Sequence, residues 1–359
     1  MTDKKRVVIK VGTSTLTYET GKINLRRIEL LSQVISDLNH SGCEVVLVSS
    51  GAIGVGVGKL GFAKRPDNTR GKQAASAVGQ SELMSMYGKF FAEYGCQVAQ
   101  ILLTKNVLED NERRTNAVNA FRTLLDWHVI PIVNENDTIS VSELMFTDND
   151  ELSGLIASMM DAQALIILSN INGIYNGSPT DPASEVIREI GQGKDLSSYI
   201  QTSKSSFGRG GMLTKTNIAR KVADEGITVI IANGKCDNIL VDLIQHPEST
   251  LCTRFTPSAE PVSSIKKWIA HSEGFAKGEL HINQCATEVL NSDKAISILP
   301  VGITAIEGEF EKDDIVRIID FEGNPVGVGK ANCNSVQAKE AMGKHGKKPV
   351  VHYDYLYIE

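Results

Sequence analysis

With 359 residues, of which 42% are apolar, the chain is long enough to form two domains, each with its own core. Its formal net charge of -6 argues against a protein built mainly to bind nucleic acid or anionic membrane. Six cysteines without a CxxC pair are interpreted as reduced thiols of a cytoplasmic protein, and no apolar run is long enough for a signal peptide or a bilayer span.

The first part of the chain alternates apolar runs with amphipathic segments. After an apolar run at 7–11, a helix is predicted that Asn24 caps and Gly42 ends. Further strands are predicted at Glu44–Val48, Val98–Leu103, Val129–Val133, Ala164–Leu168 and Ile227–Ala232. Further helices are predicted at Lys72–Tyr94, Arg113–Trp127, Glu151–Met160 and Met212–Glu225. Nearly continuous Val, Ile and Leu are typical of buried parallel strands, so residues 1–255 are predicted to form an α/β/α sandwich with a mainly parallel open sheet.

The pattern changes after Phe255. Residues 256–276 contain two prolines near their start and are predicted to form a linker. Residues 277–359 are predicted to form a small, mainly β domain with closely spaced short strands. These strands are predicted at Gly278–Asn283, Ala295–Leu299, Gly302–Glu309, Ile315–Asp320 and Pro325–Lys330.

Two segments place a lysine beside small residues that can bind phosphate. Lys10 ends the first apolar run, and the Gly12-Thr13-Ser14 turn after it can offer backbone N–H groups to a phosphate oxygen. The segment Gly208–Lys215 is a glycine-rich turn leading into a helix, and its lysine can reach a γ-phosphate. It lacks the Gly-Lys-Ser/Thr order of a Walker A loop. Taken singly, each segment could instead be a surface turn beside a solvated lysine.

Two other segments carry groups suited to an amino acid. Ser50-Gly51 follows a strand and is interpreted as a backbone clasp for a carboxylate, although a strand-to-helix turn also needs small residues. In the polar run Asn134–Asp137, Asp137 suits an α-amino group and Asn134 a carboxylate. The GxGxxG pattern at Gly56–Gly61 lies several residues past its strand, so it is not interpreted as a dinucleotide fingerprint.

Asp148-Asn149-Asp150 precedes the helix predicted from Glu151. The ordinary explanation is helix capping, because Asp and Asn are favoured at helix starts. Capping needs only one of the three residues, which leaves two for chemistry. The spacing of an EF-hand calcium loop is not met, and no metal site formed by the protein itself is predicted.

Together these segments indicate phosphoryl transfer. Ligands bind beyond the carboxyl ends of the strands in an open parallel sheet, so the segments are expected to hold one long ligand along one sheet edge. Two lysines and glycine turns suit the positioning and charge neutralisation that phosphoryl transfer requires. A carboxylate acceptor, with a side-chain pKa of about 4.3, is already ionised near neutral pH. It needs no general base, and none of the seven histidines lies in these segments.

Read in order, the segments resemble the glutamate 5-kinases of the amino acid kinase family over nearly the whole chain. The matching motifs are Lys10–Ser14, Ser50–Ile53, Gln73, Ala77–Gln80, Asn134–Asp137, Asp148–Asp150, Gly210–Met212 and Thr214-Lys215. The C-terminal part resembles a PUA domain. The resemblance implies ATP-dependent phosphorylation of the γ-carboxylate of L-glutamate, the first step of proline biosynthesis.

The resemblance also implies roles for individual residues. Lys10 and Lys215 would flank the transferred phosphoryl group, with Asp150 orienting both lysines and Asp148 assisting. The residues implied to bind glutamate are Ser50, Gly51, Asn134, Asp137 and Asn149. The residues implied to bind the nucleotide are Lys10, Ser169, Asn170, Gly208, Arg209, Gly210, Gly211, Met212, Leu213, Thr214 and Lys215.

Three positions depart from the family pattern. Ser169-Asn170 stands where Thr-Asp is common, Arg209 where threonine is usual and Thr147 where glycine is usual. The first departure removes a charge from a nucleotide contact. None of them alters the two lysines or Asp150, so the implied activity is unchanged.

The resemblance further implies several partners. Mg²⁺ would arrive with ATP, bound mainly by phosphate oxygens and water. Proline would inhibit at the glutamate site, the chain would form a homodimer or homotetramer, and the product could be handed to glutamyl phosphate reductase. An acetylglutamate kinase is the near alternative, and an RNA-binding protein is the alternative from another class. Acidic residues outnumber basic ones in 277–359, so RNA binding is not expected to be the main role.

Overall fold

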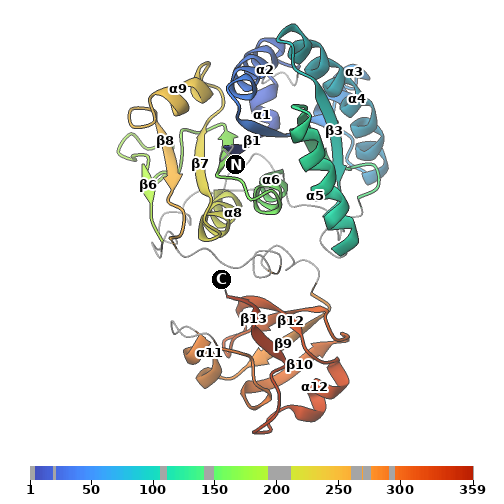
Figure 1. Ribbon diagram of the computed structural model, residues 1–359, viewed down its shortest axis with the longest axis vertical. Coiled ribbons are helices and arrows are strands. Elements are labelled where there is room, and N and C mark those ends of the chain that lie inside the picture. Colours follow the sequence, from blue (N-terminus) through green and yellow to red (C-terminus); the bar gives the residue numbers. More distant parts are fainter. Residues whose placement is uncertain are drawn as a thin grey trace. The chain divides into compact units, whose positions relative to one another are not determined.

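The computed structural model describes residues 5–18, 22–105, 111–140, 149–192, 212–259, 269, 276–290 and 296–358. The chain forms two compact units, Met1–Pro261 and Val262–Glu359 (Figure 1). Within the described ranges, no helix combines the length and the apolar character that crossing a membrane requires. Most of the predicted linker at 256–276 lies outside these ranges, so the predicted domain boundaries stay a proposal.

The first unit is built on an eight-stranded sheet with the strand order β3-β4-β2-β1-β5-β7-β8-β6. The strands are β1 (Arg6–Val11), β2 (Glu44–Ser49), β3 (Val98–Leu103), β4 (Ile130–Glu135), β5 (Ala164–Ser169), β6 (Glu189–Ile190), β7 (Thr228–Asn233) and β8 (Cys252–Phe255). Every neighbouring pair is parallel except β7 and β8. The predicted mainly parallel sheet is therefore confirmed, and β6 and β8 are additions that the sequence did not predict.

Helices cover both faces of this sheet (Figure 1). They are α1 (Thr13–Leu16), α2 (Leu25–His40), α3 (Ala52–Lys59), α4 (Thr69–Glu93), α5 (Asn111–Asp126), α6 (Asn149–Met159), α8 (Met212–Asp224) and α9 (Ile239–Gln245). On one face, the strand residues Ile9 and Leu47 share a core with Ile28 of α2 and Tyr87 of α4. Helices α5, α6 and α8 pack on β4, β5 and β7 respectively. Because side chains alternate along a strand, coverage of both faces requires the continuous apolar runs seen in the sequence.

Glycines allow α3 and α4 to pack unusually close together. A Cβ added at Gly56 would lie 1.8 Å from the carbonyl oxygen of Ala75, and one at Gly79 would lie 1.8 Å from that of Ala52. Gly56 is thus a packing residue within α3. Helix α4 begins three residues earlier than predicted, because the Asn68 side chain accepts a hydrogen bond from the Gly71 amide.

The second unit contains a five-stranded sheet with the order β10-β9-β11-β12-β13. Its elements are β9 (Gly278–Ile282), α11 (Gln284–Leu290), the short 3₁₀ helix η3 (Pro300–Gly302), β10 (Ile303–Gly308), β11 (Ile315–Ile319), β12 (Pro325–Ala331), α12 (Ser335–Ala341) and β13 (Val351–Ile358). The strand predicted at Ala295–Leu299 is wrong for its described part, where Ile298 forms only an isolated bridge with Val351. Strand β13, which the sequence did not predict, pairs with β12 at the end of the sheet and contains the Val351 of that bridge.

Candidate functional site

The order of the strands in the first unit brings the candidate residues into one row. Strands β4, β2, β1, β5 and β7 are neighbours and parallel, so their carboxyl ends meet at one edge of the sheet. Asn134 belongs to β4, Ser50 follows β2, Lys10 lies near the end of β1 and Ser169 ends β5. This edge is where open parallel sheets bind ligands. The row runs from the residues expected to bind an amino acid to those expected to bind a nucleotide.

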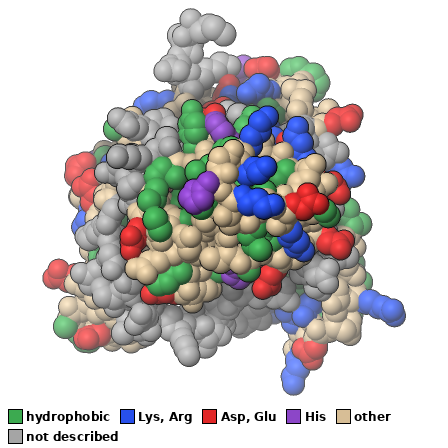
Figure 2. All heavy atoms as spheres, turned by 90° about the horizontal axis from the view of Figure 1, so that it is seen from below, with side chains coloured by type: hydrophobic (Ala, Val, Ile, Leu, Met, Phe, Trp, Pro, Cys, Tyr) green, Lys and Arg blue, Asp and Glu red, His purple; other side chains and the backbone are tan. Residues whose placement is uncertain are grey.

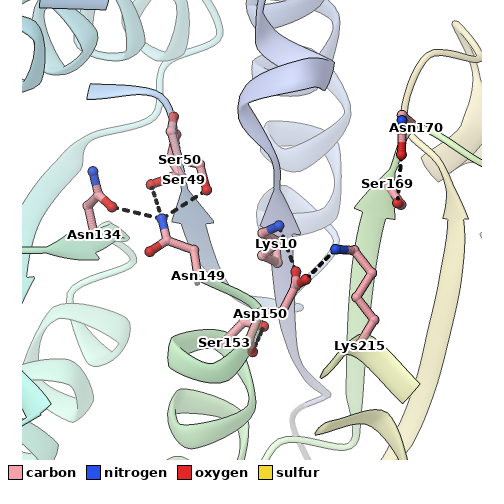
Figure 3. Close-up of polar contacts among 10 residues, drawn as sticks. All are labelled: Lys10, Ser49, Ser50, Asn134, Asn149, Asp150, Ser153, Ser169, Asn170 and Lys215. Atoms are coloured by element: carbon pink, nitrogen blue, oxygen red, sulfur yellow. Dashed lines mark hydrogen bonds and ion pairs between the residues drawn. The ribbon is translucent and has the colours of Figure 1, made fainter. Parts of the chain in front are cut away.

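A buried carboxylate holds two lysines at the centre of the row (Figure 3). Asp150, in the first turn of α6, is fully buried, and its Oδ1 lies 2.6 Å from Lys10 Nζ. Its Oδ2 lies 2.8 Å from Lys215 Nζ, at the start of α8. Burial by itself would raise the pKa of Asp150, but the charges of Lys10 and Lys215 outweigh that effect and lower the pKa below its usual value. The carboxylate therefore stays ionised and keeps both ammonium groups in fixed positions.

The burial of Lys10 strengthens the effect of its charge. Its side chain is almost fully buried, so its charge acts in a medium of low dielectric constant, where it attracts a phosphate oxygen more strongly than a solvated lysine does. A Cβ at Gly12 would lie 3.4 Å from Lys10 Nζ, an ordinary van der Waals contact, so the space beside the ammonium group does not by itself require a glycine there.

Asn149 connects the first turn of α6 to the ends of β2 and β4. Its Nδ2 lies 3.0 Å from the carbonyl oxygen of Ser49, 2.9 Å from Ser50 Oγ and 2.8 Å from Asn134 Oδ1. Asn149 and Asp150 are adjacent in sequence, yet Figure 3 shows Asn149 pointing to the asparagine and serine groups and Asp150 pointing to the lysines. One helix start therefore positions both the centre of the row and the end suited to an amino acid.

Helix α4 contacts the polar run after β4 through two side chains. Ser76 Oγ donates a hydrogen bond of 2.6 Å to Asp137 Oδ2, and Gln80 Oε1 accepts one of 2.9 Å from Asn134 Nδ2. A cavity of about 390 Å³ opens beside these groups and is lined in part by Ser76, Gln80, Asp137 and Thr138. Sequence reasoning did not assign Ser76 or Gln80 to the site, because no local pattern links a helix interior to a strand end 54 residues later.

The opposite end of the row is formed by β5 and β7. Ser169 Oγ donates to Asn170 Oδ1 over 3.4 Å, and Ser169 pairs in register with Asn233 at the end of β7. Asn233 Nδ2 donates to Asn172 Oδ1 over 2.9 Å. Asn172 and Asn233 are polar residues at this edge that sequence reasoning missed. The signal was present, since Asn233 follows a predicted strand in the same way as Ser169.

Some predicted site residues fall outside the described part of the chain. Asp148 and Gly208–Gly211, including Arg209, lie outside the described residues. The remaining predicted loop residues, Met212, Leu213, Thr214 and Lys215, form the first turn of α8. Gly51 has a φ of 104° and precedes α3, so the turn after Ser50 needs a residue that tolerates positive φ.

Comparison with known proteins identifies the family of the chain. The sequence pattern of the amino acid kinase family matches residues 5–233, and that of the PUA domain matches residues 278–353. The chain is 68% identical to a glutamate 5-kinase of Bacteroides thetaiotaomicron over 99% of this chain and 98% of that protein. It is 50% identical to a glutamate 5-kinase of Clostridium perfringens over 67% of this chain and 92% of that protein.

A solved structure supports the fold alone. The crystal structure of an isopentenyl phosphate kinase substrate complex has a TM-score of 0.50 and 16% identity, and the match covers 69% of this chain and 99% of that chain. The expected fold and the expected resemblance are confirmed, including the PUA domain of the C-terminal part. On the family pattern and on relatives that match it from end to end, the chain belongs to the amino acid kinase family.

Proposed function

We propose that this protein transfers the γ-phosphoryl group of ATP to the γ-carboxylate of L-glutamate. The observation that carries the proposal is the position of Lys10 and Lys215 on one buried carboxylate, between an asparagine cluster and the end of β5. Relatives that match the chain over nearly its whole length carry the name glutamate 5-kinase. The Clostridium perfringens relative, which carries the same name, matches 67% of this chain.

The reaction requires little covalent chemistry from the protein. A glutamate carboxylate oxygen attacks the γ-phosphorus, the bond from that phosphorus to the bridging oxygen of ADP breaks, and ADP leaves with the electron pair. No proton moves, because the carboxylate acceptor is ionised near neutral pH. Lys10 and Lys215 neutralise charge that spreads over the equatorial phosphoryl oxygens. Asp150 acts through both lysines and is a positioning residue.

The amino acid would lie toward Asn134 and Asn149. Asn149 holds Ser50 and Asn134 together, and these groups can bind the α-carboxylate, while Asp137 can accept hydrogen bonds from the α-ammonium group. The nucleotide would lie toward Ser169-Asn170 and the start of α8. This arrangement directs the γ-carboxylate toward the two lysines.

Mg²⁺ is proposed to enter with the nucleotide. Both oxygens of Asp150 contact lysines, so this carboxylate is not available as a metal ligand. Asp137 accepts a hydrogen bond from Ser76 and belongs to the amino-acid end of the row. Phosphate oxygens and water are the ligands that Mg²⁺ prefers when it is bound with ATP. When bound, the ion would supply further neutralisation of phosphate charge.

Several finer proposals follow from the family resemblance. Proline is proposed to inhibit at the glutamate site, the protein to act in the cytoplasm as a homodimer or homotetramer, and the product to pass to glutamyl phosphate reductase. RNA binding is not proposed as a main role. Figure 2 shows Asp and Glu side chains among the Lys and Arg side chains of one face, a mixed arrangement in place of a wholly basic surface.

Trapping with hydroxylamine tests the reaction, because it converts an acyl phosphate to a hydroxamate, which is measured as its coloured ferric complex. The purified protein with ATP, Mg²⁺ and L-glutamate is expected to form hydroxamate, whereas N-acetylglutamate or aspartate is expected to form little. Product with N-acetylglutamate and none with glutamate would reject the proposal. Rates that saturating proline leaves unchanged would reject the proposed inhibition alone.

A further inference from the structure

Two side chains one turn apart on α4 contact two side chains of the polar run after β4. Ser76 donates to Asp137 over 2.6 Å, and Gln80 accepts from Asn134 over 2.9 Å. Residues four positions apart lie on the same face of a helix, so one face of α4 carries both contacts. Ser76 and Gln80 are both buried.

The contacts are held by a rigid helix. Gly79 lies between Ser76 and Gln80 in sequence and brings α4 against α3, where a Cβ would lie 1.8 Å from the carbonyl oxygen of Ala52. One turn further along, the buried Leu83 anchors α4 in the core. A side chain that projects from such a helix loses little additional freedom when it forms a hydrogen bond. The helix therefore fixes the two hydrogen-bonding groups in space.

Each contact also fixes the direction in which its partner can bind a ligand. Ser76 Oγ donates to Oδ2 of Asp137, which limits the rotation of this carboxylate. Gln80 Oε1 accepts a hydrogen bond from Asn134 Nδ2, which adds to the hydrogen bonds that Asn134 Oδ1 accepts from Asn149 and from the Glu135 amide. Amide and carboxylate groups without such partners would rotate among several orientations.

We propose that Ser76 and Gln80 are positioning residues that set the affinity of the site for the amino acid end of its substrate. The inference rests on the proposed function, in that Asp137 binds the α-ammonium group and Asn134 the α-carboxylate of glutamate. Neither α4 residue contacts Lys10, Asp150 or Lys215 through the hydrogen bonds seen here. Their loss therefore changes the KM for glutamate and leaves the KM for ATP and kcat nearly unchanged.

Ser76→Ala tests the first contact with Ser85→Ala as its control. Ser85 lies on the same helix, is exposed and contributes no group to the site. Ser76→Ala is expected to raise the KM for glutamate about 10-fold, the loss typical of one hydrogen bond to a charged group. Ser85→Ala is expected to leave both KM values unchanged. Ser76→Thr keeps the hydroxyl and is expected to restore the KM to within about 3-fold of wild type.

A mutant cycle with Asp137→Ala decides whether Ser76 acts through Asp137. If it does, Ser76→Ala adds no further rise in KM once Asp137 has been replaced, and this holds even if the single variant is less stable. Equal effects of Ser76→Ala in both backgrounds would overturn the inference. A Ser76→Thr variant with a KM for glutamate as high as that of Ser76→Ala would also overturn the inference, because the effect would then come from packing.

Gln80→Met tests the second contact, because it keeps the length of the side chain and removes the acceptor. The KM for glutamate is expected to rise several-fold with kcat unchanged. A several-fold fall in kcat with no change in the KM for glutamate would overturn the inference. Failure of the proposed function has a different signature. In that case the wild-type protein itself forms no hydroxamate from glutamate, whereas failure of this inference leaves wild-type activity intact.

Discussion

Asp150→Asn removes the charge that holds the two lysines and changes almost nothing in shape. Asp150 is fully buried, and the side chains of Lys10 and Lys215 are 7% and 14% exposed. Removing one partner from a buried ion pair costs about 3 to 5 kcal/mol, because the remaining charge stays buried without compensation. Both lysines retain some exposure, so we expect a loss near 3 kcal/mol. That loss lowers the Tm of a unit of this size by about 6 to 12 °C.

The pH dependence of this loss has a defined sign. The pKa of Asp150 is lowered from its usual value of 3.8, so the carboxylate stabilises the folded state above that value. The stabilisation is lost as the pH falls through the lower pKa of the folded state. The difference in unfolding free energy between wild type and Asp150→Asn is therefore expected to be constant from about pH 8 to pH 5 and to narrow only below pH 3.8.

Scanning calorimetry and the hydroxamate assay measure the two consequences. The transition that ATP shifts upward identifies the kinase unit. Asp126→Asn makes the same change at an exposed position of α5 and is the control. We expect Asp150→Asn to lower kcat strongly, since both lysines lose their anchor, while the control matches wild type. An Asp150→Asn variant with unchanged Tm and kcat would refute the interpretation of Asp150 as the residue that holds the lysines.

Three further predictions concern the site and its supports. Lys215→Ala is expected to lower kcat about 100-fold or more with little change in the KM for glutamate, and equal changes in both would assign Lys215 to binding. Gly79→Ala is expected to destabilise the protein by about 1 to 3 kcal/mol in urea unfolding, because its Cβ has no room. Gly58→Ala, which meets nothing within 4 Å, is the control and should not destabilise. Tyr87→Phe removes a buried hydrogen bond of 2.9 Å to Ser49 and is expected to lower the free energy of unfolding by about 1 kcal/mol. An unchanged unfolding midpoint would show that this hydrogen bond does not stabilise the fold.

The elements of the first unit were predictable because their signals are local. The apolar run before Gly12 and the Asn24 cap specify a strand and a helix start without reference to distant residues, and the Asn24 side chain does accept from the Arg27 amide. The strand at 252–255 was not predictable in the same way. It is short, and it forms because β7 presents an open edge to which it pairs in the antiparallel direction.

In the second unit, too, local sequence patterns did not decide which runs form strands. The run at 295–299 is apolar enough to predict a strand, but pairing partners decide whether a run becomes one. In the described part of this unit, Ile298 forms only an isolated bridge with Val351, whereas Val351–Ile358 pairs with β12. Its tyrosines and charged residues obscured the signal, since an edge strand needs only one apolar face.

The sequence by itself determined which residue types were available: two lysines beside glycines, a polar run after a strand and an acidic group at a helix start. The order of these motifs along the chain also indicated the amino acid kinase family. Only the tertiary structure decided that β4, β2, β1 and β5 are neighbours, which arranges these groups in a row. It also decided that Ser76 and Gln80 form hydrogen bonds with the polar run after β4. The physical reason is that strand order and helix packing are set by contacts between residues far apart in the chain, which local patterns do not encode.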